Sequence, residues 1–117
     1  MSKIAVSDNG EYLTRDGRPF FYLGDTVWMA FANLPFDKWE SYLSFRRMQG
    51  FNALQISILP VTHDNSVSPE NLDPFRRDAD GNWDFRAYNE DYFQKAESMV
   101  ALALQYGFVP VLGVLWC

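Results

Sequence analysis

The 117-residue sequence contains one cysteine and one histidine. Because Cys117 is the only cysteine, an internal disulfide and a multi-cysteine metal site are excluded. The sequence also lacks a glycine-rich phosphate loop, the Cys-x-x-Cys and His-x-Glu metal spacings, and the Gly-x-Ser-x-Gly nucleophile elbow. We therefore expect no cofactor and no bound metal.

Positive charge is scarce as well. The sequence has ten Lys and Arg residues and fifteen Asp and Glu residues, which gives a net charge of −5. We therefore expect no nucleic-acid partner, because binding to nucleic acid needs a basic protein surface. The longest apolar run, near residues 108–117, is too short to cross a membrane, and Met1-Ser2-Lys3 lacks the apolar stretch of a secretion signal. We expect no membrane partner and a cytoplasmic location.

The N-terminal residues alternate between apolar and polar types over residues 4–21. Asn9-Gly10 and Asp16-Gly17 interrupt this alternation, and such pairs favour type I′ turns. The pattern predicts an antiparallel β-hairpin over residues 1–19. The apolar run at 20–23 then predicts a first parallel strand, buried on both faces, that stops at Gly24-Asp25-Thr26.

The next segment has the signals of a helix followed by a strand. Pro35 suits the first helical position, and Arg46 and Arg47 suit the last turn before Gly50. The helix carries a broad apolar stripe formed by Trp39, Tyr42, Leu43 and Phe45. A second, mostly buried strand is expected over residues 51–59.

A second helix and a third strand follow after a long connection. Residues 60–87 show no sustained period and are predicted to form a loop. Asn89 is a good N-cap, Tyr88 is placed to pack against Phe93 across it, and Gly107 suits the helix end. A third apolar strand is expected over residues 108–116.

This order of elements predicts the fold class. Strand, helix, strand, helix, strand implies right-handed crossovers and a parallel sheet. We expect an α/β fold that is a partial (β/α)8 TIM barrel, with three parallel strands and two helices after the hairpin, residues 20–117 being the first β/α units. A complete barrel takes about 250 residues. We therefore expect the open strand edges to pair with a second copy of the chain or with a missing C-terminal part of the barrel.

Candidate site residues follow from the rule that barrel sites lie at the carboxyl ends of the strands. Asp25 suits hydrogen bonding to substrate hydroxyls, or the capping of a turn. Trp28 and Trp116 suit an apolar platform for a sugar ring, or core packing. Gln55 points into the barrel mouth or is satisfied by a neighbouring loop. His63 contacts a ligand or is an incidental loop residue.

Longer motifs along the chain add a resemblance. The opening hairpin, with Asn9-Gly10-Glu11-Tyr12-Leu13 and Asp16-Gly17-Arg18-Pro19-Phe20-Phe21, is similar to that of many barrel glycosidases. The later motifs together resemble the apiosidase-like glycoside hydrolases: Gly24-Asp25-Thr26-Val27-Trp28, Gln49-Gly50-Phe51-Asn52 with Gln55, Tyr92-Phe93, and Tyr106-Gly107-Phe108. The resemblance spans nearly all of the chain. One departure is Leu34-Pro35, where relatives tend to have a Thr or Ser cap.

The resemblance implies a retaining hydrolase of terminal sugar linkages, with apiosyl links in plant pectin side chains as the candidate substrate. It also implies two catalytic carboxylates, placed after the fourth and seventh strands of the barrel. No catalytic residue is therefore carried over to this chain, and we expect both beyond residue 117. Asp25, Trp28, Gln55 and Trp116 match family positions around the substrate pocket.

Three hypotheses remain open at this stage. The first is the N-terminal part of a glycoside hydrolase that is inactive alone. The second is a non-catalytic carbohydrate-binding or assembly module derived from a barrel. The third is an unrelated small α/β domain, which would need more helices to cover its sheet than the sequence offers.

Overall fold

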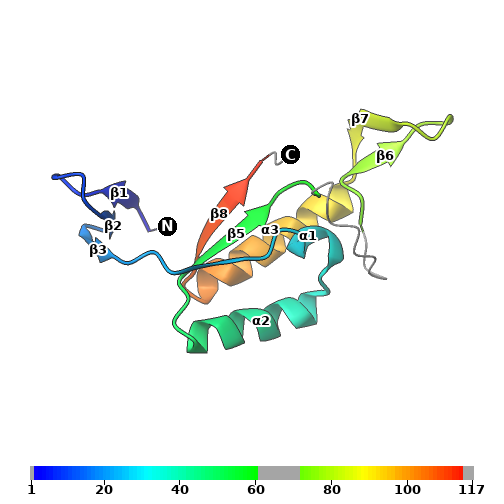
Figure 1. The fold of residues 1–117 in the computed structure, drawn as a ribbon. Helices are drawn as coiled ribbons and strands as arrows, with labels where there is room; N and C mark the ends of the chain where they lie inside the picture. Colours follow the sequence, from blue (N-terminus) through cyan, green and yellow to red (C-terminus); the bar gives the residue numbers. More distant parts are fainter. Residues whose placement is uncertain (1, 61–71, 115–117) are drawn as a thin grey trace.

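The computed structural model describes residues 2–60 and 72–114. The strands of this part form an antiparallel sheet at the N-terminus, a central parallel sheet, and a separate two-stranded hairpin. Figure 1 shows the central sheet with helices beneath it and the other two sheets at its opposite ends. The molecule is elongated as a result, with extents of 55 × 29 × 25 Å.

The N-terminal sheet consists of β1 (Ile4–Val6), β2 (Leu13–Arg15) and β3 (Arg18–Phe20). Antiparallel pairing is confirmed, and the sheet has three strands where a two-stranded hairpin was expected. Asp16 and Gly17 have φ angles of 52° and 78°, as a type I′ turn requires. The other connection is longer, and the Ser7 amide donates to the Tyr12 carbonyl at 2.8 Å across it.

The central sheet contains β4 (Gly24–Thr26), β5 (Ala53–Ser57) and β8 (Val109–Gly113). Both pairings are parallel and the order is β4-β5-β8, which confirms the predicted sheet. The prediction for the first of these strands was wrong in position, because residues 21–23 precede β4 and are exposed. Phe21 has 79% of its surface exposed, so the apolar run there does not lie inside a covered sheet.

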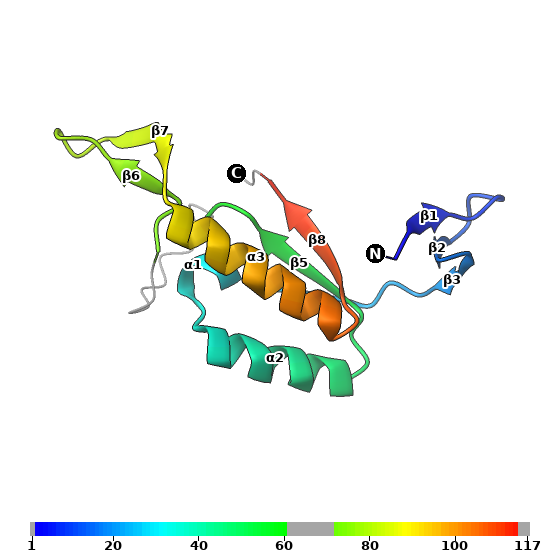
Figure 2. The ribbon, with the colours of Figure 1, turned by 180° about the vertical axis from the view of Figure 1, so that it is seen from behind.

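Three helices cover one face of this sheet: α1 (Ala30–Asn33), α2 (Phe36–Met48) and α3 (Glu90–Gln105). The two views, from the front and from behind, agree that α2 and α3 lie on the same side of β5 and β8 (Figures 1 and 2). The core between helices and sheet holds fully buried side chains from each layer, among them Phe31, Trp39, Leu54, Ile56, Met99 and Phe108. The fold class expected from the sequence is therefore confirmed.

Local details of the helices differ from the prediction. Pro35 is the N-cap of α2, with ψ of 149°, and the helix begins one residue later than expected. Phe45 was expected in the apolar stripe but is 53% exposed. The short helix α1 was not predicted. At α3 the expected packing of Tyr88 against Phe93 is confirmed, with ring centroids 6.1 Å apart, and Gly107 has a φ of 83° at the helix end.

The segment predicted to be a loop over residues 60–87 is in part regular structure. It contains β6 (Phe75–Arg77) and β7 (Trp83–Tyr88), which pair antiparallel with a bulge after Phe75. The turn is closed by Asp78, whose carboxylate accepts hydrogen bonds from the amides of Asp80 and Asn82 at 3.0 and 2.9 Å. The loop prediction was wrong for these residues, because apolar and polar side chains alternate along β7 as they do in a strand.

Candidate functional site

The carboxyl ends of the parallel strands form the edge at which barrel sites lie. The chain passes from β5 at this edge to β6 and β7, and α3 then leads to β8 in the sheet (Figure 1). Two backbone bonds join the strand ends: the Val27 amide donates to the Gln55 carbonyl at 2.9 Å, and the Ser57 amide donates to the Trp28 carbonyl at 3.1 Å. Trp28 therefore lies at the edge where a site residue was expected.

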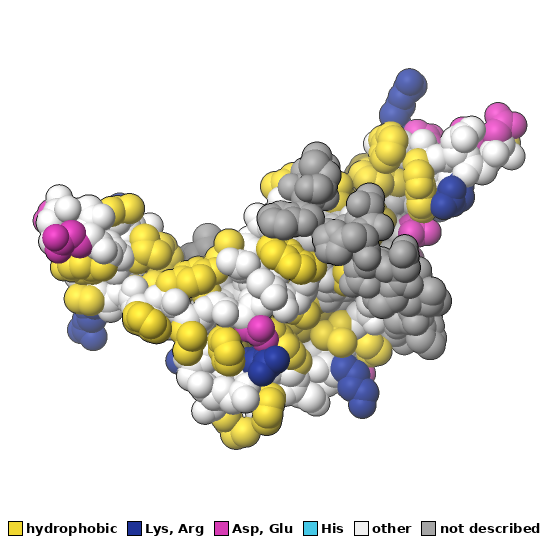
Figure 3. All heavy atoms as spheres, in the orientation of Figure 1, with side chains coloured by type: hydrophobic (Ala, Val, Ile, Leu, Met, Phe, Trp, Pro, Cys, Tyr) yellow, Lys and Arg dark blue, Asp and Glu magenta, His cyan; other side chains and the backbone are white. Residues whose placement is uncertain are grey.

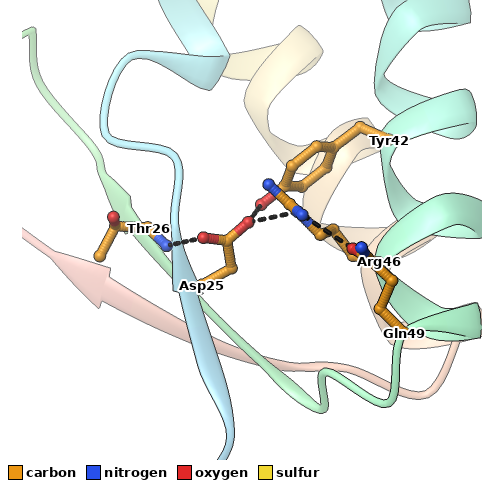
Figure 4. A network of polar contacts seen from close by, with 5 residues as sticks. All are labelled: Asp25, Thr26, Tyr42, Arg46 and Gln49. Carbon is orange, nitrogen blue, oxygen red and sulfur yellow. Dashed lines mark hydrogen bonds and ion pairs between the residues drawn. The ribbon is translucent and has the colours of Figure 1, made fainter.

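Asp25 lies within β4, and its side chain points away from the open face of the sheet towards α2 (Figure 4). One carboxylate oxygen accepts the Tyr42 hydroxyl at 2.8 Å and lies 2.6 Å from Nε of Arg46. The other accepts the amide of Thr26 at 2.9 Å. Both oxygens are thus bound within the protein, and the Asp25 side chain is 22% exposed.

Aromatic rings complete the surroundings of this ion pair. The Arg46 guanidinium lies 5.5 Å from the ring centroid of Tyr42 and 5.3 Å from that of Phe51. Burial, followed by the hydrogen bond to Asp25, raises the pKa of Tyr42 well above its ordinary value. Tyr42 therefore stays a neutral donor, and the cluster joins β4 to α2.

Gln55 lies on the other face of the sheet, opposite the helices. It pairs in register with Thr26 and Val111, so these three side chains share the face that the helices leave open. The Gln55 amide donates to the Tyr22 hydroxyl at 3.0 Å. The Tyr22 ring in turn packs on Gly24, where a Cβ would lie 2.8 Å from the ring. Tyr22, a neighbouring side chain, is therefore the hydrogen-bond acceptor for the side-chain nitrogen of Gln55.

The structure thus separates the predicted site residues. Asp25 faces the helices, Gln55 faces the open side, and Trp28 follows the carboxyl end of β4. His63 and Trp116 lie outside the described residues. Contact of any of these five residues with a substrate stays a prediction.

A cavity that the sequence analysis missed lies at the same edge. It has a volume of about 300 Å³ and is lined by Leu59 and Pro60, just after β5, and by the aromatic side chains of Phe75, Trp83 and Phe85 on the hairpin. The signal was present in the sequence, because Trp83, Phe85 and Ala87 alternate with polar residues.

Residues 2–60 and 72–114 contain neither a candidate metal site nor a candidate membrane-spanning helix. No three His, Cys, Asp or Glu side chains of that part gather closely enough to hold a metal ion. No helix described there has the length and apolar character to span a bilayer.

Comparison with protein families decides the family of the chain. The model of the apiosidase-like catalytic domain matches residues 7–117. The chain belongs to this family. Among curated proteins, none matches the sequence significantly.

Solved structures support the barrel architecture of this apiosidase-like chain. A family 5 glycoside hydrolase of Bacteroides vulgatus matches 94% of the chain at 23% identity, with a TM-score of 0.68, over 24% of its own length. A single-residue variant of a family 5 mannosidase of Rhizomucor miehei matches 96% at 18% identity, with a TM-score of 0.70, over 27% of its length. A variant of that mannosidase in complex with mannosyl-fructose matches 93% at 19% identity, with a TM-score of 0.64, over 26% of its length. The apiosidase-like chain therefore spans about a quarter of the length of these structures.

The three parallel strands of the apiosidase-like chain carry a single carboxylate, that of Asp25. Glycoside hydrolysis uses two carboxyl groups on either side of the scissile bond. Because both oxygens of Asp25 are bound to neighbours in β4 and α2, this residue is placed to hold the sheet against the helix.

Proposed function

We propose that this chain is the N-terminal part of a glycoside hydrolase and that it binds carbohydrate at the carboxyl edge of its parallel sheet. The observation that carries the proposal is the match of the apiosidase-like catalytic domain to residues 7–117. The parallel order β4-β5-β8, with helices on one face, supports it as the opening of a barrel.

The finer proposal concerns the linkage. Apiosyl linkages, such as those of plant pectin side chains, are the proposed substrate on the strength of the family. The catalytic acid/base and nucleophile are proposed to lie outside residues 1–117, because Asp25 is the one carboxylate on the described parallel strands and is bound by Tyr42 and Arg46.

The test assays two samples side by side: residues 1–117 alone, and the gene product in which they lie. The substrates are 4-nitrophenyl glycosides, the β-apioside among them, and pectin fragments, with released sugar measured by chromatography. We expect sugar release from the gene product and none from residues 1–117. Release by residues 1–117 alone would contradict the placement of the catalytic pair, and no release by either sample would contradict the hydrolase proposal.

The alternative is a carbohydrate-binding or assembly module without catalysis. It is favoured by the internal bonding of Asp25, which leaves no carboxylate of the parallel strands free to react. Saturable sugar binding by the gene product without any sugar release supports this alternative over the hydrolase.

A further inference from the structure

The cavity between β5 and the β6–β7 hairpin has the position of a ligand site. Its floor begins at Leu59 and Pro60, which follow the carboxyl end of β5, and its wall is formed by the hairpin. Its volume of about 300 Å³ is at the lower end of the range for small-molecule sites, which suits one compact ring.

The wall of this cavity is aromatic and partly open to solvent. Trp83 is 38% exposed and Phe85 is 71% exposed. Phe75 and Phe85 pack edge to face with ring centroids 5.2 Å apart. Exposure of large aromatic side chains to water is unfavourable, and the free energy falls when a ligand with an apolar face covers them. Figure 3 shows hydrophobic side chains over the part of the hairpin nearest the sheet, and acidic side chains at its tip.

The rings are held in place before any ligand binds. The Arg77 guanidinium lies 3.7 Å from the ring centroid of Trp83, and it donates to the Gly81 carbonyl at 2.8 Å. At the base of the hairpin, Asn89 donates from its side chain to the Asp73 carbonyl and from its backbone to the Pro74 carbonyl, at 3.0 and 2.8 Å. Fixing these groups in advance reduces the entropy that binding would otherwise cost.

A polar group is available beside the aromatic wall. Asp73 lines the same cavity and is exposed. A sugar ring matches this combination, because its C–H groups pack on an aromatic face while its hydroxyls donate to a carboxylate at the rim.

We propose that this cavity binds one monosaccharide ring of a glycoside, with Trp83 packing under the apolar face of the ring and Asp73 accepting a hydroxyl. The inference rests on the proposed function only for the class of ligand. It adds a binding site on the hairpin to the residues that the sequence analysis named.

Binding is tested by equilibrium titration of the gene product with methyl β-apiofuranoside, methyl α-mannopyranoside and cellobiose. We compare the wild type with Trp83→Ala, with Trp83→Phe, and with Phe36→Ala as a matched control. Phe36 is 45% exposed at the start of α2, away from the cavity. Far-ultraviolet circular dichroism and thermal unfolding check that each variant is folded.

We expect saturable binding of at least one of these sugars and a Kd about tenfold higher for Trp83→Ala. Trp83→Phe and Phe36→Ala are expected to stay within about threefold of the wild type. The proposal is overturned if none of the sugars binds the wild type, or if Trp83→Ala binds as well as the control.

The hydrolysis assay separates this inference from the proposed function. If the gene product releases sugar and Trp83→Ala leaves KM unchanged, the cavity is not a sugar site although the hydrolase proposal stands. If no sugar is released but binding depends on Trp83, the cavity is a sugar site and the hydrolase proposal fails.

Discussion

At the scale of single residues, the polar contacts of Asp25 show how a motif residue serves the fold. Strand periodicity turns its side chain to the helix side of β4, where Tyr42 and Arg46 reach it from successive turns of α2. The rings of Tyr42 and Phe51 lie beside the Arg46 guanidinium and limit its contact with water. The pair is therefore stronger than an ion pair on an open surface.

Replacing Asp25 tests this role. We expect Asp25→Ala to lower the free energy of unfolding by about 1–3 kcal/mol, because it removes the acceptor of the Tyr42 hydroxyl and the carboxylate partner of Arg46, whose guanidinium keeps its hydrogen bond to Gln49. Asp25→Asn keeps an acceptor for Tyr42 and is expected to lose less. The measurement is urea unfolding, with the exposed Asp80 changed to Ala as the control, expected within about 0.5 kcal/mol of the wild type. Equal stability of Asp25→Ala and the control would contradict the role.

One buried tyrosine, Tyr92, and one half-buried tyrosine, Tyr42, predict a dependence on alkaline pH. Burial raises the pKa of Tyr42 and of Tyr92, and the Tyr92 hydroxyl donates to the Ile58 carbonyl at 2.6 Å. An unfolded tyrosine loses its proton near pH 10, whereas these two keep theirs in the fold. Stability is therefore complete below pH 10 and falls as the pH rises above it, by at most about 1.4 kcal/mol per pH unit for each residue.

Urea unfolding between pH 9 and pH 11 measures this slope. Above pH 10, we expect Tyr92→Phe to reduce the slope of unfolding free energy against pH by up to about 1.4 kcal/mol per pH unit, the contribution of one tyrosine. The variant also lowers stability at neutral pH, because the hydrogen bond of the Tyr92 hydroxyl is lost. A slope identical to that of the wild type would contradict the prediction, because it would mean that Tyr92 has the same pKa in the folded and the unfolded protein.

At the scale of elements, the contact between α2 and α3 is fixed by one fully buried side chain. Trp39 has no exposed surface, and its indole nitrogen donates to the Met99 carbonyl at 2.9 Å. The Trp39 ring also stacks on Tyr42, with centroids 5.4 Å apart. This residue therefore sets both the spacing of the helices and the place of the Tyr42 hydroxyl beside Asp25.

We expect Trp39→Phe to lower the free energy of unfolding by about 2–4 kcal/mol, through a cavity and the loss of the hydrogen bond to Met99. Met48→Ala is the control, because Met48 is 77% exposed at the end of α2. Thermal unfolding followed by circular dichroism measures both variants. A midpoint for Trp39→Phe equal to that of the control would contradict the account of the helix contact.

The sequence predicted the elements that have a clear hydrophobic periodicity or clear end signals. It missed short elements and side-chain orientations that depend on contacts with other parts of the chain. The α3 helix was found because Asn89 and Gly107 mark its ends. The β6–β7 hairpin was missed because β6 has only three residues and its alternation is short. The orientation of Asp25 was not predictable from the sequence. Gly24-Asp25-Thr26 was interpreted as the turn that ends a strand, whereas these three residues pair with β5 and are themselves the strand β4.

At the scale of the whole molecule, the helices that the structure describes all lie on one face of the parallel sheet. In the described part of the chain, β4 and β8 each pair with β5 alone, so both have an open edge. Val114, just after β8, is 67% exposed, and an apolar groove of about 430 Å³ runs between α3 and the sheet, lined by Ile58, Val100, Leu104 and Leu112 among others. Such edges and grooves favour association.

We therefore predict that residues 1–117 alone associate at micromolar concentration. Sedimentation velocity over a hundredfold range of concentration measures this, and the mean sedimentation coefficient is expected to rise with concentration. Val114→Lys places a charge beside the β8 edge and is expected to weaken association, whereas Met48→Lys on α2 is the control. A single monomeric species at every concentration would contradict the prediction.

The central claim is that sugar binds at the carboxyl edge of the parallel sheet, and amide chemical-shift mapping tests it most directly. The gene product labelled with nitrogen-15 is titrated with methyl β-apiofuranoside and methyl α-mannopyranoside. The account predicts that the shifted amides cluster at Trp28, Ser57 and Trp83. Shifts clustered at the opposite edge, near Arg15 and Gly107, where the Arg15 guanidinium donates to the Gly107 carbonyl at 3.0 Å, would contradict it.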